Sequence, residues 1–375
     1  MEFRLDSRQQ EWAQRARAFA REVIAPRADE IDTTGEYPWD IVQGMADEGF
    51  LGMNIPPAYG GSGESLTGIC AVILEIGQVC ASSAAILCAY LLGSYPILLA
   101  GSEAQKRKVL PEVAAGRRGP AFSLTERTAG SDAGSLRTTA VLEGDSWVLD
   151  GDKCFVGNGG AAHFYTVFAR TGDRISAFLV EKGTPGFTIG PFERKMGIRG
   201  TMTAELHFRR CRIPRENLVG ELGRGMRLAL ATLDLGRVTT AAQALAIAIG
   251  AYKHALRWAW ERVQFGAPIL ENQAIQFMLA DMITEIKAAE LLIYKAAALH
   301  DAGAGRITRE AAVAKVYATE VANRVVDRAV QIHGGYGYCK PNPVERFYRD
   351  QRVTQIYEGT SEIQRLVIAR HLIEA

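Results

Sequence analysis

The sequence predicts an α+β fold that is mainly helical, with a β-domain inserted between two helical regions. Apolar residues recur at helical spacing through the first 118 residues, strand-like alternation follows from 119 to 224, and helical spacing then returns. Because strands and helices do not alternate, a parallel βαβ sheet is disfavoured. We expect an N-terminal helical domain at 1–118, a middle β-barrel or sandwich domain at 119–224, and a C-terminal four-helix bundle at 225–375.

The N-terminal region reads as a series of helices. Trp12, Ala16, Phe19 and Val23 share one face of an expected helix over 6–25, which should end at Pro26. A short helix should follow over 38–49, and 65–116 should be mostly helical. The stretch 76–102 carries no charged side chain, but polar residues and a proline interrupt it. Two buried helices explain this stretch better than a membrane span, which we do not expect.

The middle region carries strand signals. Residues 140–149 predict two strands joined at Gly144-Asp145, and 165–169 and 175–180 are further strand candidates. Polar and apolar residues alternate over 204–208, as in a half-buried strand.

The C-terminal region should supply the bundle. Apolar stripes predict long helices over 225–264, 271–302 and 308–333, with a shorter helix after Ser361. Ser361 and Gln364 have the spacing of a capping box at the start of that last helix.

Composition excludes several classes of function. The 375 residues carry a net charge of +1 and no basic cluster, which gives no reason to expect a nucleic-acid partner. The six cysteines have no metal-ligand spacing, so we expect reduced thiols, a cytoplasmic location and no metal site. The N-terminus lacks the apolar run of a signal peptide. Dinucleotide-binding G-x-G-x-x-G, P-loop and nucleophile-elbow motifs are absent.

The strongest candidate for chemistry is Glu358, near the C-terminus. It precedes the expected helix start, beside Gly359, and is flanked by the apolar Ile356 and aromatic Tyr357. Desolvation of this carboxylate would raise its pKa and make it a stronger base. Most acidic loop residues are solvated, so this stretch alone does not decide the matter.

Four other segments are rich in glycine and hydroxyl groups, at 122–134, 152–160, 262–266 and 331–338. Each taken alone is typical of a turn or helix cap. The first offers open amides and hydroxyls that suit a phosphate or polar ring edge, and Phe155 in the second could stack on a planar group.

Together, these segments closely resemble the acyl-CoA dehydrogenase family, and within it the short- or medium-chain-like flavoproteins. The motifs that carry the resemblance are Leu124-Thr125-Glu126 to Gly134, Arg262 to Gly266, Gln331 to Tyr338, Pro343-Val344-Glu345-Arg346, and Tyr357 to Arg365. The resemblance covers essentially the whole chain. It implies the three-domain fold given above, bound FAD, and a homotetramer built as a dimer of dimers.

The resemblance also implies roles for individual residues. Glu358 matches the catalytic base that removes the α-proton of an acyl thioester, while flavin N5 takes the β-hydride. The product is a trans-2-enoyl thioester, and an electron-transfer flavoprotein or similar acceptor receives the electrons. Matches to flavin-contacting positions are Phe122, Leu124, Thr125, Gly130, Ser131, Phe155, Gly157, Thr360 and Glu362. Matches to positions that hold the ADP half, partly across a dimer interface, are Arg262, Phe265, Gln273, Gln331, Gly334 and Gly335.

Substrate contacts are implied for Ser131, Asp234, Arg237 and Gly359, with the planar fork of Arg237 suited to a phosphate of CoA. Some relatives place the base on an earlier helix. Gly236 occupies that position here and cannot act as a base, which supports Glu358.

Three residues depart from the family pattern. Arg127 stands where proline is usual, Phe155 where tryptophan is common, and Gly157 where a serine or threonine hydroxyl normally contacts the flavin near N5. We expect Gly157 to alter the flavin potential or its reactivity with oxygen. Arg127 could meet an acidic carrier or a CoA phosphate, or it could be a solvated surface residue.

Several alternatives to an acyl-CoA dehydrogenase stay open. One acts on acyl groups tethered to a carrier protein in a biosynthetic pathway, and another is an oxidase that passes electrons to oxygen. A helical scaffold that has lost its chemistry is a third, although the presence of Glu358, Arg237 and Arg262 together argues against it. Acyl chain length and branching do not follow from the sequence.

Overall fold

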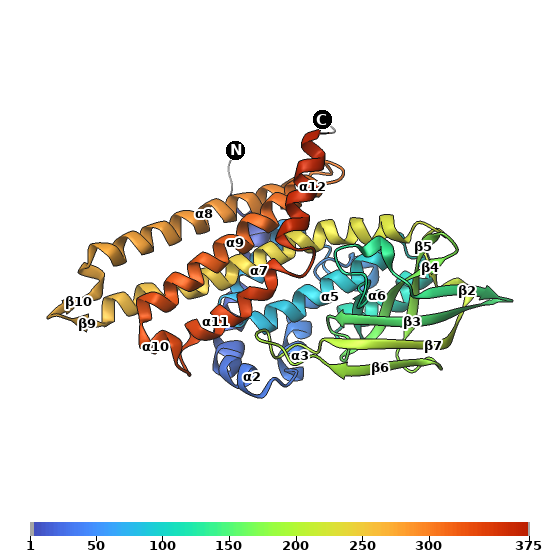
Figure 1. The fold of residues 1–375 in the computed structure, drawn as a ribbon, viewed down its shortest axis with the longest axis horizontal. Coiled ribbons are helices and arrows are strands. Elements are labelled where there is room, and N and C mark those ends of the chain that lie inside the picture. The colour runs from blue at the N-terminus through green and yellow to red at the C-terminus, as the bar shows by residue number, and fades with distance from the viewer. Residues whose placement is uncertain (1–3, 374–375) are drawn as a thin grey trace.

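The computed structural model describes residues 4–373, and its N-terminal part is helical (Figure 1). The helices of this part are α1 (Ser7–Phe19), α2 (Ala28–Thr34), α3 (Trp39–Asp47), α4 (Leu66–Gly77), α5 (Ala81–Ala100) and α6 (Glu103–Ala114). The helix expected over 6–25 is α-helical only to Phe19. A π-turn at Ala20–Ile24 and a 3-10 turn at Ala25–Arg27 follow, because Pro26 lacks the N–H that a continued α-helix needs.

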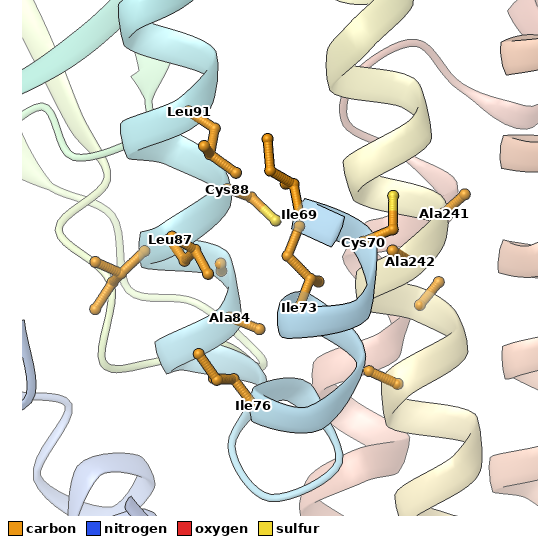
Figure 2. Packing of buried hydrophobic residues seen from close by; sticks show 14 of the residues in the cluster. Ile69, Cys70, Ile73, Ile76, Ala84, Leu87, Cys88, Leu91, Ala241 and Ala242 are labelled. Carbon is orange, nitrogen blue, oxygen red and sulfur yellow. The ribbon is translucent and has the colours of Figure 1, made fainter. Parts of the chain in front are cut away.

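The apolar helices α4 and α5 pack inside the protein. Figure 2 shows Ile73 of α4 and Leu87 and Cys88 of α5 in one buried cluster, with Ala241 and Ala242 of α7 on the other side of α4. Within residues 4–373, α5 alone has the length and hydropathy of a membrane span, but 67% of its most apolar window is buried. It is therefore a core helix, as the sequence predicted.

The middle part is one mixed sheet of eight strands with its own buried core. The strands are β1 (Gly119–Ser123), β2 (Thr139–Glu143), β3 (Ser146–Val156), β4 (Ala162–Thr171), β5 (Arg174–Glu181), β6 (Phe187–Phe192), β7 (Ala204–Pro214) and β8 (Leu218–Val219). Their order is β6-β7-β3-β2-β4-β5-β8, with β1 parallel to β4. The predicted hairpin is β2–β3, and Gly144 supplies the positive φ of its turn. Strands β1, β6 and β8 were not predicted.

The C-terminal part is a helical bundle around α7 (Gly225–Glu261), which lies between the N-terminal helices and the rest of the bundle. The other helices are α8 (Gln273–Asp301), α9 (Thr308–His333), α10 (Gly335–Tyr338), α11 (Pro343–Gln351) and α12 (Ser361–Ile373), and β9 (Val263–Gln264) pairs with β10 (Ala267–Pro268). The three long helices begin and end within three residues of the predicted positions. Helix α11, which follows the Asn342 cap, was not predicted.

The predicted capping box at Ser361 is wrong in detail. The hydroxyl of Thr360 accepts the amide of Ile363, and the buried Ser361 hydroxyl has no hydrogen-bond partner among residues 4–373. The Gln364 side chain points back instead, and its amide donates to the carbonyls of Glu358 and Gly359. The first turn of α12 therefore stabilises the preceding Glu358–Gly359 turn through the side chain of Gln364.

Gly93 tests how tightly α5 packs on the sheet. A Cβ at this position would lie 2.8 Å from the carbonyl carbon of Pro120 and 2.9 Å from the amide nitrogen of Ala121, both backbone atoms of β1. We predict that Gly93→Ala lowers the free energy of unfolding by about 1–3 kcal/mol, because the backbone of β1 cannot rotate out of the way. Leu99→Ala on the same helix is the control, since Leu99 is exposed and should change stability by less than about 0.5 kcal/mol. Equal thermal unfolding of Gly93→Ala and the parent would contradict this packing.

Candidate active site

Glu358 lies in a strained turn between α11 and α12. Its backbone has φ of +55°, a left-handed conformation that non-glycine residues rarely adopt, and Gly359 follows with φ of +90°. Two side chains donate to the main-chain carbonyls of this turn. Gln364 Nε2 donates to the carbonyl oxygens of Glu358 at 3.2 Å and Gly359 at 2.8 Å, and Lys315 Nζ donates to that of Gly359 at 2.7 Å. Strain of this kind persists where the surroundings fix the backbone, and it is common at active sites.

The turn directs the Glu358 carboxyl group at α7. A Cβ built on Gly236 would lie 2.9 Å from Oε2 of Glu358 and 2.8 Å from Cδ1 of Leu92 on α5. Oε2 is buried and has no hydrogen-bond partner within residues 4–373. Burial raises the pKa of Glu358 to about 7, against the opposing effect of the Lys315 and Arg237 charges. The desolvation expected from the sequence is therefore present.

The predicted substrate residues Asp234 and Arg237 form a buried ion pair on α7, with 2.8 Å between Asp234 Oδ1 and Arg237 Nη1. Arg237 is only 4% exposed, so it does not present its fork of donors at the surface for a phosphate; its charge instead acts on the nearby Glu358 carboxyl group. Sequence reasoning missed Arg306, whose largely exposed guanidinium approaches Asp234 Oδ2 at 3.1 Å. Arg306 lies in the loop before α9, and no sequence pattern there indicated a contact with Asp234.

Lys315 was also missed. Its side chain is fully buried in α9, and burial lowers its pKa to about 8, an effect that Glu358 partly opposes. A signal did exist, since Lys315 is a single charge in the apolar run from Ala311 to Val316. Such a residue is costly to bury unless it has a partner.

A second buried pair anchors the segment predicted to line the flavin. Lys153 Nζ donates to Glu126 Oε1 at 2.8 Å and to the Leu124 carbonyl at 3.1 Å. Glu126 also accepts the amides of Arg137 and Thr138. These contacts fix the backbone around Thr125, whose carbonyl accepts the amide of Cys154 at the end of β3.

The predicted flavin-ring residues lie near this anchor. Phe122 lies in β1, and Leu124 and Thr125 follow that strand. Phe155 is near the end of β3, and Gly157 comes directly after it. Phe155 is 65% exposed and has φ of +55°, so its ring is available for stacking. A Cβ on Gly157 would approach only Ala89, at 4.0 Å, and one on Gly130 would approach nothing within 4 Å. Next to these residues, Ser123 Oγ and Asn158 Nδ2 are buried and have no partner within the described chain. Ser131 is exposed on the same segment.

The residues predicted to hold the ADP half lie elsewhere. Arg262 follows the last residue of α7, about 40 Å along the helix axis from Gly236. Its guanidinium carbon lies 5.4 Å from the ring centre of Tyr336, which brings the 262–273 and 331–335 segments together. Phe265 is fully exposed at the tip of the β9–β10 hairpin, and Gln273, Gln331, Gly334 and Gly335 are exposed. Figure 1 shows this hairpin and α10 at the end of the bundle farthest from the sheet.

The remaining predicted contacts flank the strained turn. Thr360 caps α12, and Glu362 is exposed in its first turn. Among the departures from the family pattern, Arg127 is a largely exposed residue that pairs with Glu205. This placement agrees with the surface interpretation.

Comparison with known proteins identifies the whole chain. The N-terminal, middle and C-terminal domain families of acyl-CoA dehydrogenases match residues 6–117, 121–211 and 223–373. An acyl-CoA dehydrogenase of Bacillus subtilis is 47% identical over 95% of this chain and 96% of its own length. The structure of butyryl-CoA dehydrogenase from Megasphaera elsdenii superposes with a TM-score of 0.97 at 42% identity, and the match covers 100% of both chains.

A further solved structure bears on the cofactor. An acyl-CoA dehydrogenase from Bacillus anthracis, described as complexed with FAD, has a TM-score of 0.95 and 32% identity. The match covers 99% of this chain and 67% of the other. The expected fold is confirmed, and the chain belongs to the acyl-CoA dehydrogenase family of FAD-binding oxidoreductases.

Proposed function

We propose that the protein converts an acyl-CoA to its trans-2-enoyl-CoA, with Glu358 as the base that removes the α-proton. The observation that carries this proposal is the unpartnered, buried Oε2 of Glu358, aimed across the space left by Gly236. A base works best when its pKa is near the operating pH, and about 7 meets that condition.

The main chain beside Glu358 supports a site for the developing enolate. Removal of a thioester α-proton places negative charge on the carbonyl oxygen, which fixed N–H donors stabilise. The Glu358 amide makes no hydrogen bond within residues 4–373, so it is free to donate. The left-handed turn fixes the direction of this amide before substrate binds.

The residues around 122–131 and 155–158 fit FAD. The exposed ring of Phe155 suits a planar group, and the unpartnered Ser123 and Asn158 atoms suit a polar edge. We assign the flavin end to Phe122, Leu124, Thr125, Gly130, Ser131, Phe155, Gly157, Thr360 and Glu362. When bound there, FAD would supply the acceptor, flavin N5, for the hydride that leaves the β-carbon of the substrate. The buried pair of Lys153 and Glu126 keeps this binding segment in place.

The ADP half is assigned to Arg262, Phe265, Gln273, Gln331, Gly334 and Gly335, partly across a dimer interface. These residues lie at the end of the bundle farthest from the sheet (Figure 1), with Arg262 about 40 Å along α7 from Gly236, the residue that faces Glu358. Their exposure supports a role in contact with another chain. We therefore propose a homotetramer built as a dimer of dimers, with domains divided at 118/119 and 224/225.

The wider context follows from the family. We propose a cytoplasmic enzyme of fatty acid metabolism that passes electrons to an electron-transfer flavoprotein. Asp234, Arg237, Ser131 and Gly359 are assigned to the substrate, with Arg237 acting inside the site and Arg306 nearer the surface.

Anaerobic flavin bleaching by a panel of acyl-CoA and acyl-carrier thioesters would identify the carrier, and peroxide release in air would indicate an oxidase.

The first prediction from the proposed function concerns Glu358 as the base. We expect Glu358→Gln to slow flavin reduction by acyl-CoA about 10²–10⁴-fold, because the amide cannot accept the α-proton. The measurement is anaerobic stopped-flow bleaching of the FAD-loaded protein. Glu290→Gln, a partly exposed change on α8 that leaves the site intact, should match the parent. Comparable rates for Glu358→Gln and the parent would refute the assignment.

The second concerns the space beside Glu358. We predict that Gly236→Ala lowers the rate of flavin reduction by about 10–100-fold, because the added methyl group displaces the carboxyl group. The methyl group would also meet Leu92, so Leu92→Ala/Gly236→Ala separates the two contacts. If displacement of Glu358 is the cause, the double variant stays slow. Recovery to the rate of Leu92→Ala would show that the Leu92 contact caused the loss.

The third concerns the departure at Gly157. The nearest atom to an added Cβ is 4.0 Å away, so a threonine fits. A new hydrogen bond to the flavin, of about 1.5–3 kcal/mol if it contacts a charged form, corresponds to a shift of roughly 30–60 mV in a two-electron potential. We expect Gly157→Thr to shift the reduction potential of bound FAD, measured by spectroelectrochemical titration. An unchanged potential would contradict a role for this position.

A further inference from the structure

Lys315 is the fully buried cation beneath the strained turn. It projects from α9, and its Nζ donates to the Gly359 carbonyl at 2.7 Å. Within residues 4–373, no ion pair under 4.0 Å joins Lys315 to a carboxylate, so a direct salt bridge does not explain its burial. Removing an ammonium group from water is costly, and an uncharged side chain would fill the same space more cheaply. The charge therefore calls for another explanation.

The contact with Gly359 ties the turn to a helix outside its own segment. Gln364 also holds the carbonyls of Glu358 and Gly359, but it belongs to α12, which continues directly from the turn. Lys315 belongs to α9, which packs along α7, the helix that carries Gly236. Lys315 thus fixes the Gly359 side of the turn relative to this surface, while on the other side the Tyr357 hydroxyl donates to Gln243 Oε1 of α7.

The charge of Lys315 also acts on the carboxyl group. The groups that face Glu358 are Arg237 from α7, Lys315 from α9, the Cys88 thiol from α5 and the neighbouring Tyr357 hydroxyl. Only Lys315 and Arg237 are cationic, and Lys315 has the larger effect against burial. Lys315 in turn faces Glu358, Arg237, Glu320 and Glu362. Arg237 already has Asp234 as a partner, so the positive charge available to Glu358 comes mainly from Lys315.

We propose that Lys315 is a positioning residue of the dehydrogenation: its ammonium group fixes the Glu358–Gly359 turn through the Gly359 carbonyl and holds Glu358 as a carboxylate. The inference rests on the proposed role of Glu358 as base. Lys315 does not touch substrate in this account. It acts through the turn and through the protonation state of Glu358.

The test is the pH dependence of flavin reduction. We expect Lys315→Met, which keeps an unbranched chain without charge, to move the acidic limb of the profile upward by about 1–3 pH units, because an opposite charge is removed from beside the carboxyl group. Near pH 7 the rate should then fall by about 5- to 500-fold, in proportion to the fraction of Glu358 that stays ionised. FAD content and thermal unfolding are measured on the same samples, since a structural defect alone would change these and leave the limb in place.

Two further variants serve as controls. Thr319→Val removes another buried polar group one turn along α9, whose hydroxyl donates to the main-chain carbonyls of Lys315 and Val316 and, within residues 4–373, to nothing outside its own helix. It should leave the limb unmoved even if stability falls. Lys315→Arg keeps the charge and should keep the limb within about 0.5 pH unit of the parent, a small fraction of the effect of removing a charge.

The outcomes separate this inference from the proposed function. If no acyl thioester bleaches the parent, the proposed function fails. If the parent is bleached and FAD-loaded Lys315→Met shows the parental limb, the positioning role alone is overturned. Should Lys315→Met fail to bind FAD, Lys315→Gln and Lys315→Arg decide. A shifted limb in Lys315→Gln together with a parental limb in Lys315→Arg supports the proposal, and a parental limb in FAD-loaded Lys315→Gln or a shifted limb in Lys315→Arg overturns it.

Discussion

The candidate active site depends on one buried carboxyl group, that of Glu358, which lies against Gly236 of α7. Glu358 has a buried, unpartnered oxygen, and its pKa is raised to about 7. An uncompensated carboxylate is unfavourable in a low-dielectric interior, so the fold has to restrain it. The backbone at Glu358 is left-handed, and Lys315 and Gln364 donate to the carbonyl of Gly359 that follows it. On the facing helix α7, Gly236 has no Cβ where the carboxyl oxygen lies.

Helix α7 connects the parts of the molecule to this group. It packs on α4 and α5 at one face and on α8 and α9 at another. Gly236, Asp234 and Arg237 all lie on it, so the space for Glu358 and the nearby charges have a common rigid support. Its length also carries Arg262 to the far end of the bundle. The same helix therefore separates the proposed base from the second predicted cofactor segment, which supports the proposal of a site shared between subunits.

Buried lysines stabilise both loops of the candidate site. Lys153 holds the 124–126 segment through the Leu124 carbonyl and Glu126, and Lys315 holds Gly359. Burial lowers the pKa of each lysine to about 8, although for Lys153 a carboxylate is in direct contact and for Lys315 it is not. A cation that donates to a main-chain carbonyl fixes backbone geometry without occupying the space a ligand needs. In both loops the lysine that fixes the backbone is therefore buried, and the exposed side of the loop stays free for a ligand.

The sequence by itself determined the helix–strand–helix order, the limits of α7, α8 and α9, and the candidate base, because hydrophobic periodicity and short motifs are local properties. It did not find Lys315 as the anchor of Gly359 or Arg306 as a partner of Asp234, and it assigned Gln364 to the wrong cap. These contacts join residues distant along the chain, or depend on which way a side chain turns. Only tertiary packing decided that Arg237 is buried and that the Glu358 carboxyl group fills the space above Gly236, since the position of one helix against another is not encoded in the spacing within either.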